Sequence, residues 1–423
     1  MTMRISPALF DQLVHALQII LPLRSPADLS LKFFFRDHPN LGSRDRAFIA
    51  ESVYAVLRRR RLLESLARNG TPRELALLAL LRLSGLSVRE LAPLLKDGEE
   101  AWLAQSRAKP SDTLPLAVQA DFPDWVVERL RASMGEAEIL ALGRAMQEPA
   151  PLDLRVNTLL AKREEVIAKL HADGINAVPT RHSPVGVRLL DKIALNQHPL
   201  FVDGKIEVQD EGSQLLTLLV EPKRRDMVVD FCAGAGGKTL LLGALMQSQG
   251  RLYALDVSER RLANLKPRLA RSGLSNVYPQ RIEHENDTKV KRLRGKIDRV
   301  LVDAPCSGLG TLRRNPDLKW RQTPQDLDDL RKKQAAILAA AAGLVKPGGR
   351  LVYGTCSFLR EENEGIVDAF LAGHPDFVLG DVQAILARQK IDLPSGRLLH
   401  LTPHEHGTDG FFAAVLERRE TSA

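Results

Sequence analysis

Short apolar runs alternate with longer amphipathic segments over residues 216–423. The runs expected to form strands are DMVVDFC, GRLYALDV, NVYPQRI, IDRVLVDAP, GRLVYGT and GFFAAVLER. Segments such as 258–273 and 324–349 separate these runs and have a helical composition. Apolar strands that alternate with helices predict an α/β fold with a doubly wound, mostly parallel sheet. Ligands of such sheets bind outside the carboxyl ends of the strands.

A helical pattern occupies residues 1–145 instead. Within 44–67 the apolar residues recur near helical spacing. Segment 71–85 opens with Thr, Pro and Glu at capping positions and ends in Gly, which are the signals of a helix start and stop. We therefore expect an all-α domain over 1–145. Shorter strand and helix signals predict a small α/β subdomain over 146–215, and 216–423 is expected to form the domain with the doubly wound sheet.

The composition adds a basic surplus to this picture. The 423 residues carry a formal net charge of +8, which favours a polyanionic partner, nucleic acid before membrane. No uncharged apolar run reaches about 18 residues, so we expect no membrane segment. Three cysteines cannot form a disulfide framework, so a reducing, cytoplasmic compartment is expected.

All three cysteines follow predicted strands. Cys232, Cys306 and Cys356 stand where apolar runs end in turns of small residues, and Asp256 closes another run. These four residues are therefore expected at the ligand-binding edge of the sheet. Intervals of 74 and 50 residues separate the cysteines, with neither a C-x-x-C motif nor clustered histidines, so we expect no metal.

The segment DFCAGAGGKT lies between a predicted strand and a predicted helix, where cofactor loops occur. A phosphate-binding P-loop would need Gly in place of Cys232, and a dinucleotide fingerprint would need Gly in place of Thr239. The remaining interpretation is the glycine loop of an S-adenosylmethionine (SAM) fold, where the backbone closely approaches a small cofactor. Asp256, which comes 26 residues after Asp230, can accept hydrogen bonds from both ribose hydroxyls.

Taken together, these motifs resemble those of the Sun/Nop-type RNA cytosine-5 methyltransferases. The resemblance is strongest to the bacterial ribosomal RNA branch, which has an N-terminal NusB-like helical domain. The motifs that carry it are LGSRDRAFIAESVYAVLR, LRVNT, VQDEGSQL, DFCAGAGGKT, DAPCSGLGTLRRNPD and GTCSF. The resemblance implies a SAM-dependent methyltransferase of Rossmann-like fold that acts on a cytosine in RNA, with ribosomal RNA favoured.

The resemblance also implies roles for individual residues. Cys356 is expected to be the nucleophile, Cys306 to aid product release, and Asp303 to lie beside the methyl donor and the target base. The implied cofactor contacts are Cys232, Ala233, Gly234, Ala235, Gly236, Gly237, Lys238, Asp256, Arg261, His284 and Asp303. The family's spacing places an acidic residue near the adenine at position 284, where this chain has His.

Methylation at C5 of cytosine explains the need for two thiols. C5 is a poor nucleophile, and a thiolate that adds to C6 makes C5 reactive toward a sulfonium methyl. The C5 proton must then leave before the thiolate is expelled, so a second group has to act in the elimination. We expect Asp303 to hydrogen-bond the ring and stabilise developing charge, and Lys238 to orient Asp303 or to lower the pKa of a thiol.

RNA binding is expected to depend on basic segments and on an unpaired or flipped base. Arg155 and Asn157 are predicted to be exposed on the small subdomain and to contact RNA. Further candidate contacts, which follow Cys306 in the chain, are Arg313, Arg314 and Lys319. The arginine run at 58–61 offers a second docking surface on the helical domain.

Three alternatives stay open. The first is transfer RNA as the substrate. The second is a DNA methyltransferase: an amino enzyme would usually show Asn/Asp-Pro-Pro-aromatic where this chain has DAPC, and a DNA cytosine-5 enzyme would use Cys306 as its nucleophile. The third is a non-catalytic RNA-binding assembly factor. We expect a monomer, because the chemistry needs only one chain.

Overall fold

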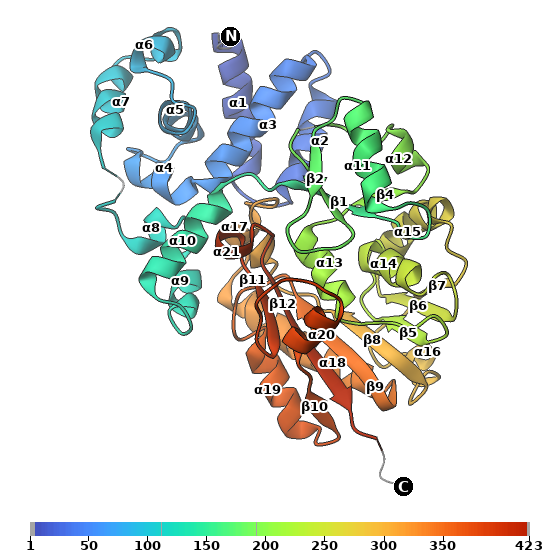
Figure 1. The fold of residues 1–423 in the computed structure, drawn as a ribbon. Coiled ribbons are helices and arrows are strands. Elements are labelled where there is room, and N and C mark those ends of the chain that lie inside the picture. The colour runs from blue at the N-terminus through green and yellow to red at the C-terminus, as the bar shows by residue number, and fades with distance from the viewer. Residues whose placement is uncertain (1–4, 111, 192, 421–423) are drawn as a thin grey trace. The chain divides into compact units, whose positions relative to one another are not determined.

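The computed structural model describes residues 5–110, 112–191 and 193–420. The chain forms two compact units (Figure 1). The helical unit comprises Met1–Pro149 and Thr311–Pro324, and the α/β unit comprises Ala150–Gly310 and Gln325–Ala423. The sequence pattern did not indicate that 311–324, which follows the DAPC motif, belongs with the helices.

An apolar core holds the helical unit together. Its most buried helix is α5 (Pro72–Arg82), in which residues 75–81 are each at most 4% exposed. The predicted capping box is present, since the side chains of Thr71 and Glu74 accept each other's backbone N–H. The unit also contains α1 Pro7–Ile20, α2 Ala27–Asp37, α3 Ser43–Arg58, α4 Arg60–Leu66, α6 Val88–Leu91, η1 Ala92–Leu94, α7 Glu99–Ala108, α8 Leu116–Gln119, α9 Asp124–Leu130, α10 Glu136–Gln147 and α17 Leu318–Arg321.

The segment 311–324 joins this unit through specific polar contacts. The indole N–H of Trp320 donates to the carbonyl of Leu57 at 2.8 Å. The ammonium of Lys319 donates to the carbonyl of Arg58 at 3.0 Å and to that of Asp121. These contacts satisfy carbonyls near the end of α3, so the segment completes the helical unit.

A four-stranded antiparallel sheet begins the α/β unit. Its order is β2-β3-β1-β4, formed by β1 Leu152–Val156, β2 Ala177–Pro179, β3 Gly186–Leu189 and β4 Ile206–Val208. The helices α11 (Arg163–Ala172) and α12 (Pro199–Val202) belong to the same region. The strand and helix signals of 146–215 correspond to β1, β3, β4 and α11. The strand β2 was missed because it has only three residues, one of them Pro.

The larger sheet confirms the predicted α/β fold. Its order is β10-β12-β9-β8-β5-β6-β7, and β11 pairs with β12. The run from β9 to β7 is parallel, whereas β10, β11 and β12 pair antiparallel. The strands are β5 Met227–Asp230, β6 Arg251–Asp256, β7 Val277–Arg281, β8 Ile297–Asp303, β9 Val345–Thr355, β10 Phe377–Leu379, β11 Leu398–Leu401 and β12 Phe411–Arg418. The short strands β10 and β11 were not predicted.

Two apolar clusters flank this sheet, as a doubly wound fold requires. One contains residues of α13, α14, α15 and α20, and the other contains residues of α16, α18 and α19. These helices are α13 Glu211–Leu218, α14 Gly237–Leu245, α15 Glu259–Ser272, α16 Thr288–Lys291, α18 Pro324–Ala342, α19 Glu364–Gly373 and α20 Val382–Arg388, and the unit also has η2 Leu309–Thr311 and α21 Pro403–His406. Within the described residues, no helix is both long and apolar enough to cross a bilayer.

Strand order decides where the site forms. The strands that end before Cys356, Cys306, Cys232 and at Asp256 are β9, β8, β5 and β6, which are consecutive neighbours in the sheet. Their carboxyl ends therefore meet along one edge, where the fold rule places a ligand.

Candidate active site

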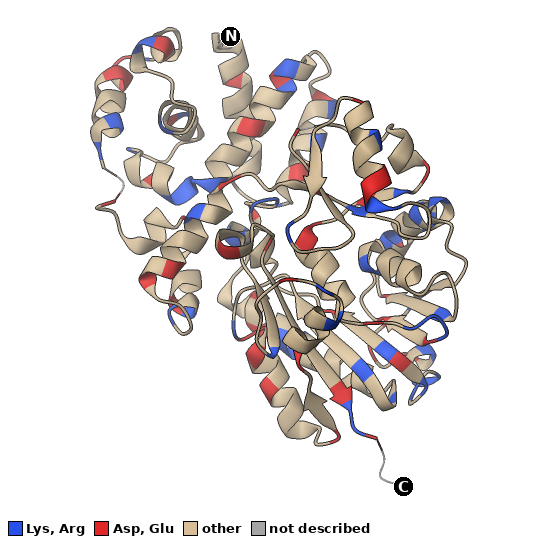
Figure 2. Cartoon of the chain, viewed as in Figure 1, with Lys and Arg blue, Asp and Glu red and all other residues tan. Residues whose placement is uncertain are grey.

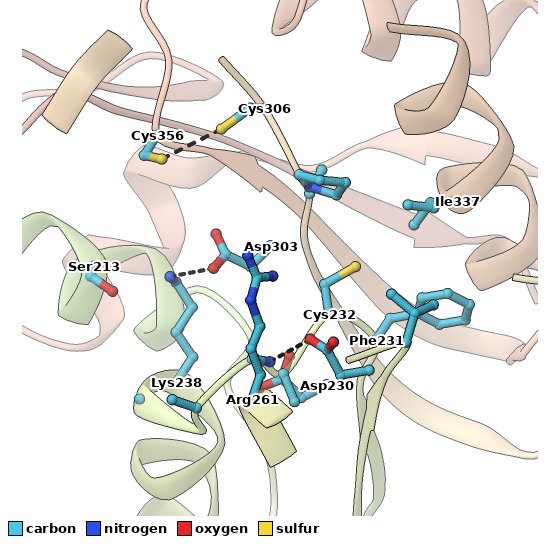
Figure 3. A pocket seen from close by; sticks show the side chains of 18 of the residues that line it. Ser213, Asp230, Phe231, Cys232, Lys238, Arg261, Asp303, Cys306, Ile337 and Cys356 are labelled. Carbon is cyan, nitrogen blue, oxygen red and sulfur yellow. Dashed lines mark hydrogen bonds and ion pairs between the residues drawn. The ribbon is translucent and has the colours of Figure 1, made fainter. Parts of the chain in front are cut away.

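A cavity of about 620 Å³ opens at these strand ends, within the α/β unit. All three cysteines line it, together with Lys238 and Asp303 (Figure 3). Asp256 lines it as well. Its lining also includes Gln209, Ser213, Asp230, Arg261, Arg268, Ile282, Glu285, Lys333 and Ile337. The cavity has the size of a site for a small-molecule cofactor.

The glycine loop after β5 shapes one wall of the cavity. Gly234 and Gly236 have φ of +56° and +82°, a backbone region that disfavours residues with a side chain. A Cβ on Gly236 would lie 2.1 Å from Cδ1 of Leu265, whereas a Cβ on Gly234 would meet nothing within 4 Å. Gly236 is thus needed for packing, and Gly234 leaves open space beside the loop.

Asp256 ties this loop to the next strand. Its Oδ2 accepts the N–H of Gly234 at 2.8 Å, and its Oδ1 accepts the N–H of Ser258 at 2.7 Å. The side chain is 5% exposed. Each carboxylate oxygen keeps a second lone pair, so Asp256 can still accept hydroxyl donors from a ligand.

Asp230, at the end of β5, is a buried carboxyl that the sequence did not single out. Its Oδ2 accepts the hydroxyl of Thr239 at 2.7 Å, while its buried Oδ1 has no hydrogen-bond partner in the protein. Burial raises the pKa of Asp230 to about 7. The hydrogen bond from Thr239 lowers this pKa but does not offset the effect of burial. An orphaned acceptor in a cavity wall indicates a site for a hydrogen-bond donor.

Lys238 and Asp303 form an ion pair across the cavity. Nζ of Lys238 lies 2.7 Å from Oδ2 of Asp303, and Figure 3 shows the lysine reaching toward this carboxylate. Burial lowers the pKa of Lys238, but the charge and hydrogen bond of Asp303 outweigh it, so the net pKa is raised. Lys238 therefore stays cationic and pairs with Asp303, an arrangement compatible with the first of its two predicted roles, which stays a prediction.

The two cysteine turns meet in the same cavity. The sulfur atoms of Cys306 and Cys356 are 3.4 Å apart (Figure 3). The hydroxyls of the next residues, Ser307 and Ser357, are 3.2 Å apart. The hydrogen bond to Cys356, and then burial, raise the pKa of Cys306 well above its usual value. Cys306 therefore stays protonated and can donate a hydrogen bond to the Cys356 sulfur.

Cys232 differs from the other two thiols. Figure 3 shows it apart from the Cys306–Cys356 pair, and it packs against the apolar cluster that contains α18. Burial, with the nearby carboxylates of Asp230 and Asp303, raises the pKa of its thiol. Its placement favours a packing role in the wall of the cavity.

The loop after β7 corrects one predicted contact. His284 is exposed, does not line the cavity, and accepts the N–H of Asn286 through Nδ1 at 3.1 Å. Glu285, the next residue, lines the cavity together with Ile282. The acidic group expected near position 284 is present one residue later, a shift that spacing alone could not reveal.

Two residues of the small subdomain that were predicted to be exposed and to contact RNA are buried instead. Arg155 and Asn157 are 2% and 5% exposed. Arg155 donates to the side chain of Gln209 and to the carbonyl of Gly237, and burial lowers its pKa to about 10. Asn157 donates to two backbone carbonyls, at 3.0 and 2.9 Å. Both side chains hold the fold together.

The basic residues after Cys306 are engaged in a similar way. Arg313 and Lys319 are 6% and 3% exposed, and Arg314 is half-buried. Burial lowers the pKa of Lys319 to about 8. Figure 2 shows Lys and Arg interspersed with Asp and Glu in both units. Burial of Arg313 and Lys319 overturns their assignment as RNA contacts.

Comparison with known proteins shows which family the chain belongs to. The family model "16S rRNA methyltransferase RsmB/F" matches residues 217–417, and an "RsmF/B-like, ferredoxin-like domain" matches residues 122–196. A probable ribosomal RNA small subunit methyltransferase B from Synechocystis is 33% identical over 93% of this chain and 96% of its own length. The chain belongs to the RsmB/F methyltransferase family.

A second relative agrees with this RsmB/F assignment, and two solved structures share the fold. A probable ribosomal RNA small subunit methyltransferase B from Bacillus subtilis is 33% identical over 72% of this chain and 68% of its own. The crystal structure of PH0851 has a TM-score of 0.78 and 27% identity, covering 98% of this chain and all of that one. NSun6 from Pyrococcus horikoshii with SFG has a TM-score of 0.63, 23% identity, and coverage of 71% and 99%.

The cofactor of this RsmB/F protein is SAM, and the cavity fits it. Gly234 leaves the space that a Cβ would fill, and the orphaned Oδ1 of Asp230 offers an acceptor. Asp256, at the end of β6, lines the cavity with a carboxylate that would suit ribose hydroxyls. Among the described residues, no group of three or more His, Cys, Asp and Glu is arranged to hold a metal ion.

Proposed function

We propose that this RsmB/F protein transfers a methyl group to C5 of a cytosine in RNA, with Cys356 as the nucleophile. The observation that carries the proposal is the 3.4 Å approach of the Cys306 and Cys356 sulfur atoms inside one cavity. A single buried thiol would have a packing role by default. Two thiols that share a cavity with an Asp–Lys pair match the division of labour that C5 methylation needs.

The cofactor would be held by the glycine loop, with Asp256 on its ribose and Glu285 in place of His284 near its adenine. Ala233, Gly234, Ala235 and Gly237 line the cavity with their backbone. Gly236 does not line it and serves the turn instead. When bound, SAM supplies the electrophilic methyl group.

The protein residues then act on the base. The Cys356 thiolate adds to C6 as N3 of the ring takes up a proton from water. The Asp303 carboxylate, held by Lys238, accepts a hydrogen bond from this N3–H or from the exocyclic amine and so stabilises the protonated ring. After methyl transfer a water molecule takes up the C5 proton. The electron pair of the C5–H bond then re-forms the C5–C6 double bond as the bond between C6 and the Cys356 sulfur breaks. The Cys306 thiol donates a hydrogen bond to the departing sulfur, which stabilises it as a thiolate.

The proposed substrate is ribosomal RNA of the small subunit, because the relatives covering most of the chain are named for it. Transfer RNA is the runner-up. Lys333 is exposed and lines the cavity, so it replaces the buried basic residues as the candidate phosphate contact, whereas Arg261, which also lines the cavity, keeps its proposed place beside the cofactor. Bisulfite mapping of 5-methylcytosine in cells with and without the gene identifies the target nucleotide.

Two RNA substrates separate the roles of the thiols. On 5-fluorocytosine RNA, which blocks elimination, the wild type and Cys306→Ala form a covalent adduct and Cys356→Ala forms none. On ordinary RNA, only Cys306→Ala accumulates the adduct. An adduct that persists in Cys356→Ala and disappears in Cys306→Ala would reverse the assignment and favour the scheme of the DNA enzymes.

A further inference from the structure

A buried carboxylate lies beneath the Cys306 turn and has no part in the scheme above. Glu362 is 0% exposed and follows Cys356 by six residues. It accepts the backbone N–H of Ser307 at 2.8 Å, the hydroxyl of Ser307 at 2.5 Å, and the side-chain amide of Gln334 at 2.9 Å. All three partners donate to Glu362, a pattern that an unprotonated carboxylate satisfies.

Gln334 extends this contact to the other side of Cys306. Its side-chain amide also donates to the carbonyl of Pro305 at 3.0 Å, and the residue is 0% exposed. The peptide groups on both flanks of Cys306 are therefore held, one by Gln334 and one by Glu362. This pair of buried side chains fixes the backbone from which the Cys306 thiol projects.

The same short loop also holds the second cysteine turn. Asn363, next to Glu362, accepts the hydroxyl of Thr355 at 2.6 Å and donates to the carbonyl of Ser357 at 3.0 Å. Thr355 and Ser357 are the residues on either side of Cys356. The hydroxyl of Tyr353 anchors the loop by donating to the carbonyl of Glu362 at 2.7 Å. Neighbouring residues of one loop thus bind both turns and set the spacing of the two sulfur atoms.

We propose that Glu362 is a positioning residue for the release step, which holds the Cys306 thiol against Cys356 and places a buried negative charge beside it. The proposal rests on the proposed function, because it needs Cys306 to assist the departure of Cys356. The geometry also has an electrostatic consequence. After the hydrogen bond to Cys356, burial and the charge of Cys356, the charge of Glu362 further raises the pKa of Cys306.

Other ionisable groups near Cys306 bear on any pH profile. Lys238, Asp303 and Lys333 line the same cavity, and Tyr353 of β9 donates its hydroxyl to the carbonyl of Glu362. Tyr353 is buried, which together with the charge of Cys306 raises its pKa, so it stays neutral over the useful range. The other groups are unchanged by a substitution at Glu362, so a shift between variants isolates its charge.

The decisive variant is Glu362→Gln, which keeps the shape and removes the charge. We expect it to form the adduct on 5-fluorocytosine RNA within about threefold of the wild-type rate but to release ordinary RNA at least about tenfold more slowly. Alkylation of Cys306 by iodoacetamide, followed by peptide mass spectrometry, should shift to lower pH. Glu364→Gln is the matched control, since Glu364 is close in the chain but faces His400 at 3.5 Å. It should match the wild type in all three readouts.

The outcomes are distinguishable. Wild-type release and an unshifted alkylation profile in Glu362→Gln would overturn the inference while leaving the proposed function intact. Failure of the wild type itself to form an adduct on 5-fluorocytosine RNA would remove the proposed function. Should Glu362→Gln not fold, Ser307→Ala carries the test, because it removes one of the contacts and keeps the charge. We expect slower release in Ser307→Ala with an unshifted alkylation profile, and wild-type release there would contradict the proposal.

Discussion

The cavity of the α/β unit and the arginine run of the helical unit both concentrate polar side chains, yet they use them differently. In the cavity, Asp230 keeps an unpaired oxygen, and the pKa values of Asp230 and Cys306 are raised. Groups held in such a state are primed for a ligand or a reaction. In the arginine run, the side chains are paired within the unit.

Each arginine of 58–61 has its own internal partner. Arg58 donates to the carbonyl of Arg313 at 3.2 Å, and Arg59 pairs with the buried Asp121 at 2.8 Å. Arg60 pairs with Glu64 at 2.7 Å and Arg61 with Asp124 at 2.9 Å, and both line a second cavity with Trp125 and Trp320. A run of basic letters is therefore a weaker sign of RNA contact than a strand end with a reactive side chain.

The largest expected effect breaks the ion pair of the cavity. Lys238→Met removes the cation that orients Asp303 and leaves its carboxylate without this partner. We expect the single-turnover rate of methyl transfer to fall about 10²–10³-fold, while SAM affinity by calorimetry changes much less. Lys332→Met, which removes an exposed cation that does not line the cavity, is the control and should stay within about threefold. A Lys238→Met enzyme that retains its rate would mean that the pair only stabilises the fold.

The glycine loop gives the next effect. Gly236→Ala places a methyl group against Leu265 at a φ of +82°, so we expect a loss of about 3 kcal/mol in the free energy of unfolding. Gly295→Ala is matched in backbone, with a φ of +66°, but would meet nothing within 4 Å. It should cost only about 1 kcal/mol. Urea unfolding measures both, and equal losses would show that backbone strain alone sets the requirement.

Asp230 provides a pH-dependent effect. Its folded-state pKa is about 7 against an ordinary 3.8, so the folded protein binds the extra proton between these values. The protonated Asp230 therefore stabilises the fold fully below pH 3.8, and this contribution is lost as the pH rises from there through about 7. Asp230→Asn should therefore raise the free energy of unfolding, relative to the wild type, by about 2 kcal/mol more at pH 8 than at pH 5. Urea unfolding without SAM measures this difference.

Thr239→Ala is the matched control for Asp230. It removes the hydrogen bond that lowers the pKa of Asp230. Its loss of stability between pH 5 and pH 8 should therefore be steeper than that of the wild type. A pH profile in which neither variant departs from the wild type would show that Asp230 is ionised throughout, and the contrast between the two regions would weaken.

The same contrast explains what the sequence could and could not predict. Cys306, Cys356 and Asp256 were found because parallel strands bring their carboxyl ends together, a rule that acts through local pattern. The acidic residue expected at position 284 lies one position later, at Glu285, because spacing along a loop does not fix which side chain faces the cavity. Glu362 was missed because its importance comes from burial under another turn. The prediction that Lys319 contacts RNA was wrong because the sequence does not show whether a long basic side chain faces solvent or backbone carbonyls.

The smallest expected effect tests the arginine run directly. Arg60 already binds Glu64, so Arg60→Ala should leave the salt dependence of RNA affinity unchanged. Lys333→Ala, at the exposed rim of the α/β cavity, should weaken binding severalfold and reduce the slope of log affinity against log salt by about 1. Filter binding across a salt series measures both variants. If Arg60→Ala lowers the slope as much as Lys333→Ala, the arginine exchanges Glu64 for a phosphate on binding. Internal pairing would then be a state of the free protein, and the helical unit would share in docking the RNA.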